Sequence, residues 1–180
     1  MAQLSYPPVG FSSTSPLNYG GITYTISSST NFSSNPAWNC VDYSTSSGWF
    51  SNRNDYNTST GIFALSGAPY ATVASGTTYT GDWVQLQLST AISITSYYIL
   101  GGGVSPYTTN PKNFVLLASN DGSTWTLIDT QSNISWSVIS YTFTISPALT
   151  VAYTYYRILI TVATADTYGC ASLNEFRLLV

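Results

Sequence analysis

The chain has 180 residues, of which 44% are hydrophobic and only 6% are charged, and its formal net charge is −3. Its four basic residues are scattered, whereas nucleic acid and anionic membrane surfaces attract clustered basic side chains. The chain contains no histidine, which removes Ser-His-Asp and Cys-His catalytic arrangements and the commonest transition-metal ligand. Because the basic residues are scattered, we expect neither a nucleic-acid partner nor membrane insertion.

Residues 1–20 are rich in Ser, Pro and Tyr, and this composition predicts an extended N-terminal arm or linker. The start of the chain shows neither the basic region nor the apolar region of a signal peptide. The length suits one domain, which we place at residues 21–180.

Short β-type runs separated by Gly, Pro, Asn and Asp fill this domain, and only a turn near residues 35–40 has helical character. Val84, Leu86 and Leu88 alternate with polar residues, and Asp121-Gly122 between two runs predicts a hairpin. The expected strands are residues 22–26, 83–88, 92–100, 114–119, 124–129, 139–145, 156–162 and 173–180. Many short strands predict an all-β, antiparallel β-sandwich of the jelly-roll type.

The seven acidic residues show no catalytic motif. A glycosidase needs two carboxyl groups that face each other across a cleft. We assign Asp121 to the hairpin turn, and Asp82 and Asp129 to solvated strand edges. An enzyme is therefore not expected.

Trp83, Trp125 and Arg157 lie within or beside apolar strands. Core packing is the usual role of such tryptophans. A buried arginine needs a carboxylate or carbonyl partner, so we predict a structural role for Arg157 rather than contact with a ligand.

Several segments, read in order, carry a family resemblance: residues 37–42 with 47–49, 81–88, 111–125, 155–158 and 172–176. The hairpin sequence SNDGSTW and the strand sequence YYRI are the most specific parts. Together the segments resemble the discoidin family, also called the coagulation factor five/eight type C domain. That resemblance implies a galactose-binding-like jelly roll, a fold also found in carbohydrate-binding modules.

In sugar-binding members of that family, the ligand lies on loops at one end of the sandwich. The resemblance thus implies a site on residues 51–60, 101–110 and 164–169. The candidate ligand-binding residues are Arg53, Asn54, Tyr56, Tyr107, Asp166 and Tyr168. The Arg, Asn and Asp side chains would hold sugar hydroxyls, and one of the tyrosines would stack on the sugar ring.

Family members with a structural calcium ion bring an early aspartate and a late glutamate to one site, which implies Ca²⁺ at Asp42, Ser47 and Glu175. The alternative is that Asp42 caps its own loop and Glu175 pairs with an arginine. If Asp42 and Glu175 converge, Cys40 and Cys170 are also close, and we expect a disulfide between them. The alternative there is two buried free thiols.

Two functions remain open. The first is a non-catalytic, lectin-like binding module whose partner is a glycan or glycoprotein surface. The second is a structural or decoration protein of a virion (a minor capsid, fibre or spike component) or of another extracellular assembly, with residues 1–20 contacting neighbouring proteins. Both functions imply an extracellular or virion-surface location.

Overall fold

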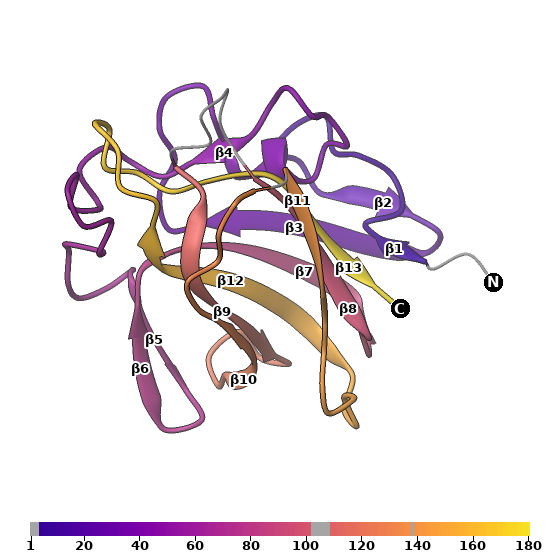
Figure 1. The fold of residues 1–180 in the computed structure, drawn as a ribbon. Coiled ribbons are helices and arrows are strands. Elements are labelled where there is room, and N and C mark those ends of the chain that lie inside the picture. Colours follow the sequence, from indigo (N-terminus) through magenta and orange to yellow (C-terminus); the bar gives the residue numbers. More distant parts are fainter. Residues whose placement is uncertain (1–3, 102–108, 138) are drawn as a thin grey trace.

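The computed structural model describes residues 4–101, 109–137 and 139–180. Two antiparallel sheets pack against each other as a sandwich, and a small two-stranded sheet lies beside them (Figure 1). The elements are β1 (Ser5–Tyr6), β2 (Leu17–Tyr19), β3 (Ile22–Ser28), η1 (Ala37–Cys40), β4 (Trp49–Phe50), β5 (Ala71–Ala74), β6 (Thr77–Thr80), β7 (Asp82–Ile92), β8 (Ser96–Gly101), β9 (Pro111–Ser119), β10 (Thr126–Gln131), β11 (Ser140–Thr144), β12 (Tyr153–Ala163) and β13 (Ser172–Leu179). The predicted all-β sandwich is confirmed, as is the short turn near residues 35–40.

The larger sheet has the strand order β10-β9-β12-β7-β3-β2. The smaller sheet has the order β1-β13-β8-β11, and β4 also pairs with β13. The last strand of the chain is therefore central in its sheet, which explains why Glu175 on β13 is fully buried.

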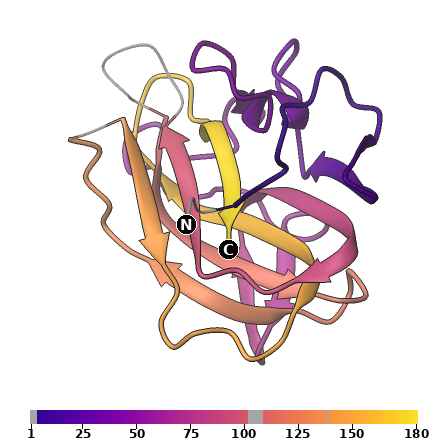
Figure 2. The same cartoon turned by 90° about the vertical axis from the view of Figure 1, so that its right-hand side faces the viewer.

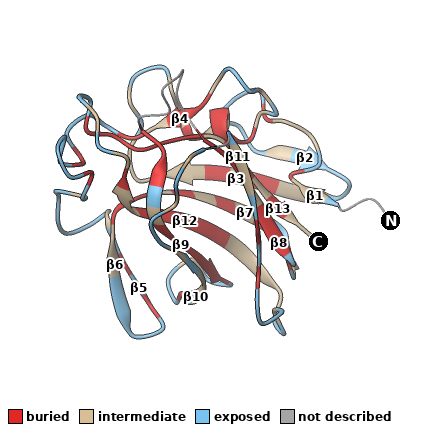
Figure 3. Ribbon diagram, viewed as in Figure 1, coloured by how far each residue is buried: buried red, intermediate tan, exposed pale blue. Residues whose placement is uncertain are grey.

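The main core lies between the two sheets. Val84, Leu86 and Leu88 on β7 are all buried, as their alternation predicts. They face buried side chains of the smaller sheet such as Ile99 and Phe176. Figure 3 shows the buried residues concentrated along the strands of both sheets.

A second, smaller core lies on the outer face of the larger sheet, beneath the β5–β6 hairpin. It consists of Ala74, Val115, Leu117, Trp125 and Leu159. The hairpin was not predicted from the sequence, although Ser75 and Gly76 at its tip both have positive φ angles, 49° and 82°. That conformation is typical of a tight two-residue hairpin turn, and Ser-Gly is a weaker signal for it than Asn-Gly.

The N-terminal segment, described from residue 4 onward, lies along the sandwich (Figure 2). β1 pairs with β13 and β2 pairs with β3, so the arm adds an edge to each sheet. Phe11, between these two strands, is buried in the main core. This apolar anchor explains why a segment rich in Ser and Pro packs on the domain.

Two predicted strand boundaries were wrong for local reasons. The run at 92–100 is interrupted, because Ile92 pairs with Tyr153 in the larger sheet whereas Ser96 pairs with Leu179 in the smaller one. The predicted hairpin near Asp121 is present, but β10 begins at Thr126. The Asp121 carboxylate accepts the backbone N–H of Thr124, so that donor is committed to the turn.

Candidate functional site

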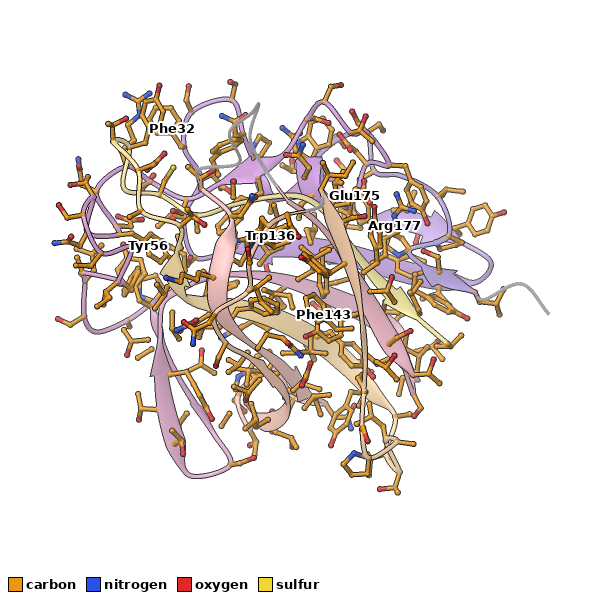
Figure 4. All side chains as sticks on the ribbon, in the orientation of Figure 1. Phe32, Tyr56, Trp136, Phe143, Glu175 and Arg177 are labelled. Carbon is orange, nitrogen blue, oxygen red and sulfur yellow. The ribbon has the colours of Figure 1, made fainter. Side chains whose placement is uncertain are left out.

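The loops at one end of the sandwich enclose an open cavity of about 180 Å³. Its lining residues are Phe32, Asn35, Phe50, Arg53, Tyr168 and Cys170. In Figure 4, Phe32 lies at this end of the molecule, beside the loop that leads into β13. Arg53 and Tyr168 were predicted from the sequence to be ligand-binding residues, and the structure brings them together here.

The Arg53 guanidinium lies between two aromatic rings, 4.7 Å from the ring centre of Phe32 and 4.8 Å from that of Tyr168. Cation–π contacts with both rings fix its plane. Within the described residues, Arg53 takes part in no ion pair and its side chain donates no hydrogen bond to protein. Because the residue is exposed, its N–H donors remain available to a ligand.

Two loops hold this arrangement in place. The backbone N–H of Asn54 donates to the carbonyl of Tyr168 (3.1 Å), and that of Tyr56 donates to the carbonyl of Gly169 (2.9 Å). The Asp166 carboxylate accepts the N–H groups of Tyr168 and Gly169 at 3.0 and 2.9 Å. Asn54 and Asp166 therefore shape the site, and neither belongs to the cavity lining.

Gly169 lets these loops approach closely. Its φ angle is +59°, and a Cβ there would lie 2.4 Å from the Tyr56 carbonyl oxygen. Any other residue at position 169 would push apart the two loops that carry Arg53 and Tyr168.

Two other tyrosine predictions have different outcomes. The prediction that Tyr56 binds a ligand was wrong, because its side chain is only 1% exposed and its hydroxyl donates to the Ile160 carbonyl at 2.8 Å. The same hydroxyl accepts the backbone N–H of Asp82 at 3.1 Å, so Tyr56 is a core residue. Tyr107 lies outside the described residues.

Two neighbouring carboxyl groups are buried near this site: Asp55, in the loop that carries Arg53, and Asp82, at the start of β7. The prediction of a solvated Asp82 was wrong: it is fully buried, and its Oδ1 accepts the hydroxyls of Ser29 and Thr30 at 2.6 and 2.9 Å. Burial, followed by the charge of Asp82, raises the pKa of Asp55 to about 7. A buried carboxyl group beside a second carboxylate favours its protonated form, so Asp55 keeps its proton to a higher pH than a free aspartate does.

A second cavity, of about 380 Å³, lies next to the first. It is lined by Asn35, Thr45, Ser46, Ser47, Gly48, Phe50 and Asn174. Asn35 and Phe50 belong to both cavities, so the two cavities are neighbours.

The three residues expected to hold calcium lie in one region. The Asp42 carboxylate accepts the Ser47 hydroxyl at 2.6 Å, and the Arg177 guanidinium that pairs with Glu175 lies 4.0 Å from the ring centre of Tyr43, the residue after Asp42. The contacts expected without a metal ion are also present. Asp42 Oδ1 caps its own loop by accepting the backbone N–H of Ser44, and Glu175 pairs with Arg177 at 2.7 Å. Glu175 and Arg177 lie together on β13 in Figure 4.

These residues fit a cation in part. Glu175 Oε1 is buried and has no hydrogen-bond partner, and Arg177 contacts only the other carboxylate oxygen. When both carboxyl groups are ionised, the single guanidinium of Arg177 leaves the region with one net negative charge. Burial raises the pKa of Glu175 to about 7. Within the described ranges, no group of three or more His, Cys, Asp or Glu side chains converges, so a bound ion would need backbone and hydroxyl oxygens as well.

The expected disulfide between Cys40 and Cys170 is contradicted: both are buried free thiols. Cys40 donates to the Ala37 carbonyl beneath the Asp42 loop, whereas Cys170 lines the Arg53 cavity. The two thiols therefore belong to different surroundings, although Asp42 and Glu175 do converge.

Arg157 has the structural role that its apolar strand predicts. Its Nη2 donates to the Gln85 side-chain carbonyl at 2.7 Å, and its Nη1 donates to Thr72 at 2.6 Å. The guanidinium lies between Trp83 and Trp125, 4.0 and 4.1 Å from their rings.

The sequence analysis missed Phe32, Asn35 and Phe50. Phe32 and Asn35 lie in a tight turn, in which the N–H of Asn35 donates to the Phe32 carbonyl at 3.0 Å. In the sequence, the only sign of this part of the site is one aromatic residue, Phe32, among Ser and Asn residues. Its pairing with Arg53 depends on contacts between segments distant in the sequence.

Solved structures of carbohydrate-binding modules share this fold. The family 32 module of NanJ from Clostridium perfringens, solved with galactose, matches with a TM-score of 0.61 and 15% identity over 87% of this chain and 93% of that one. Module CpGH89CBM32-5 of the same organism, solved with GalNAc-β-1,3-galactose, matches with a TM-score of 0.60 and 15% identity over 86% and 94%. A chitosan-binding module from Paenibacillus sp. IK-5 matches with a TM-score of 0.58 and 17% identity over 86% and 92%.

These matches confirm the discoidin-like, galactose-binding-like jelly roll that the sequence resemblance implied. Neither a protein-family profile nor a curated protein sequence matches the chain. Within the described residues, the chain has no helix of the length and apolarity needed to cross a bilayer.

Proposed function

We propose that this protein is a non-catalytic carbohydrate-binding module whose ligand contacts the cavity around Arg53. The observation that carries the proposal is the guanidinium of Arg53, held between the Phe32 and Tyr168 rings with its donors unused by protein. The solved structures that share the fold include modules in complex with galactose and with GalNAc-β-1,3-galactose.

The chemistry of the cavity suits a sugar. An aromatic ring provides an apolar surface for the C–H face of a pyranose, and Tyr168 is 50% exposed. The Arg53 donors and the Asn35 amide would hold hydroxyl groups at the ring edge. Such a module acts where glycans are displayed, which favours an extracellular location.

Catalysis has no support in the described part of the chain. Asp55 and Asp82 are both buried inside the protein, whereas a glycosidase places its two carboxyl groups on either side of a glycosidic bond. The virion alternative also has no support, since the matched structures reported above are carbohydrate-binding modules.

A glycan array tests the proposal. We expect the wild-type chain to bind a defined set of glycans, and Arg53→Ala to lose at least tenfold in affinity, because each hydrogen bond to a charged donor contributes about 1.5–3 kcal/mol. Lys112→Ala, which removes an exposed cation outside the cavity lining, is the matched control and should bind as the wild type does. Equal binding by wild type and Arg53→Ala would contradict the proposed site.

We further propose that Asp42, Ser47 and Glu175 hold a structural Ca²⁺ ion. The unpartnered Glu175 Oε1 and the net negative charge of this region support it. The ion would fix the loop after η1 to β13. Calcium should raise the midpoint of thermal unfolding of the wild type and leave that of Glu175→Gln unchanged. The same midpoint with calcium and with chelator would show that Arg177 alone balances the two acids.

A further inference from the structure

We propose that the ligand is an oligosaccharide of at least two sugar residues, which lies in one trough formed by the two neighbouring cavities. The inference rests on the proposed function and extends it to the length of the ligand. The first cavity would hold one sugar against Phe32, Arg53 and Tyr168. The second cavity, bounded by residues 45–48 and Asn174, would hold the next sugar.

The two residues that line both cavities belong to segments held by backbone hydrogen bonds. Phe50 and Asn35 line both cavities, and the Phe50 carbonyl accepts the N–H of Phe32 at 2.9 Å. Phe50 belongs to β4, which pairs with β13 through Ser172 and Leu173. The trough therefore crosses an ordered strand, and the half-buried Phe50 ring lies where two linked sugars would meet.

The far end of the trough has the chemistry of a subsite for an uncharged sugar. Its lining contains hydroxyl and amide side chains and no ionisable side chain. Asn174 is oriented by its Nδ2, which donates to the Thr45 carbonyl at 3.0 Å, so its Oδ1 is left to accept from a sugar hydroxyl.

Gly48 keeps this end open. A Cβ at Gly48 would lie 2.3 Å from Asn174 Oδ1, so any larger residue would displace the amide from its position. The combined volume of the two cavities, about 180 and 380 Å³, exceeds what one sugar residue needs and is in the range of ligand sites of about 300–1,000 Å³.

Titration calorimetry on the full chain with matched probes tests the trough. The probes, all uncharged, are galactose with GalNAc-β-1,3-galactose, and N-acetylglucosamine with its β-1,4-linked disaccharide. For the pair that binds, we expect the disaccharide to bind about tenfold more tightly than the monosaccharide, which one or two additional hydrogen bonds supply.

Asn174→Ala should lower the disaccharide affinity to that of the monosaccharide and leave monosaccharide binding unchanged. Ser46→Trp, which fills the second cavity, should do the same, and thermal unfolding confirms that both variants fold. Arg53→Ala should weaken both ligands. Equal affinity of wild type for a monosaccharide and its disaccharide would overturn the trough while the proposed function stands. No binding of any probe by wild type would overturn both.

Discussion

Arg53 and Arg157 each lie between two aromatic rings, yet only the Arg157 guanidinium donates hydrogen bonds to protein side chains within the described residues. Arg157 is 9% exposed, its guanidinium is hydrogen-bonded to Gln85 and Thr72, and burial lowers its pKa to about 10. Arg53 is exposed and donates no side-chain hydrogen bond within the described residues.

The difference indicates what each pair of rings does. At Arg157, the rings of Trp83 and Trp125 close over a cation that joins β12 to the β5–β6 hairpin through Thr72. At Arg53, the rings of Phe32 and Tyr168 orient the cation and leave its donors exposed. An arginine whose plane is fixed and whose donors are unused is prepared to bind a ligand.

The largest effect is expected for Arg157→Met. This variant keeps an apolar stem but leaves the Gln85 carbonyl and the Thr72 hydroxyl without their donor. We expect the free energy of unfolding to fall by about 2–4 kcal/mol. Chemical denaturation measures the loss, and hydrogen exchange should show the β5–β6 hairpin opening first. Glycan binding by the folded protein should be unchanged.

The same substitution at the other arginine sharpens the comparison. Arg53→Met should change the free energy of unfolding by no more than about 0.5 kcal/mol, because the residue is exposed. Glycan affinity should fall at least tenfold in the same preparation. A large loss of stability would show that Arg53, like Arg157, is a structural residue.

Tyr168 and Tyr56 differ as the two arginines do: the first is exposed at the proposed site and the second is a core residue. The expected effects are smaller. Tyr168→Ala removes an exposed ring and should weaken glycan binding by about 1 kcal/mol, or roughly fivefold, with little change in stability. Tyr56→Phe leaves the Ile160 carbonyl without its donor and should lower stability by about 1–2 kcal/mol. Calorimetry and denaturation of both variants test the pair. A binding defect in Tyr56→Phe without loss of stability would contradict its assignment to the core.

The last prediction concerns pH. The pKa of Asp55 is about 7 in the folded protein, raised from its ordinary value of 3.8 by burial and by Asp82. The unfolded chain therefore releases this proton at lower pH, and stability falls as pH rises from about 4 through 7. Asp55→Asn should make the decline between pH 5 and pH 8 shallower. Glu175, whose pKa is also about 7, would account for the remaining slope. An unchanged slope in Asp55→Asn would rule out the raised pKa of Asp55.

The strands were predictable because their signal is local. Val84, Leu86 and Leu88 alternate with polar residues, and a half-buried strand requires that period. The β5–β6 hairpin was missed because its short, polar strands bury little except Ala74 and Thr72. Ala74 belongs to a second core that no local pattern reveals, and Thr72 accepts a hydrogen bond from Arg157.

The candidate site was predictable only in part. The resemblance placed Arg53 and Tyr168 in binding loops, and both line the cavity. Tyr56 lies in the same loop as Arg53, but the direction of each side chain depends on contacts across the sandwich. Tyr56 therefore reaches the Ile160 carbonyl in the core while Arg53 lies between rings at the surface. The same dependence explains why Cys40 and Cys170 remain apart.

By itself, the sequence determined the fold class and the absence of histidine chemistry, because composition and strand periodicity are local properties. The loops proposed for a site were implied by the family resemblance. Only the tertiary structure decided which arginine is available to a ligand. Burial and hydrogen-bond partners come from residues distant in the chain: Gln85 and Thr72 satisfy Arg157, whereas Phe32 and Tyr168 hold Arg53 without using its donors.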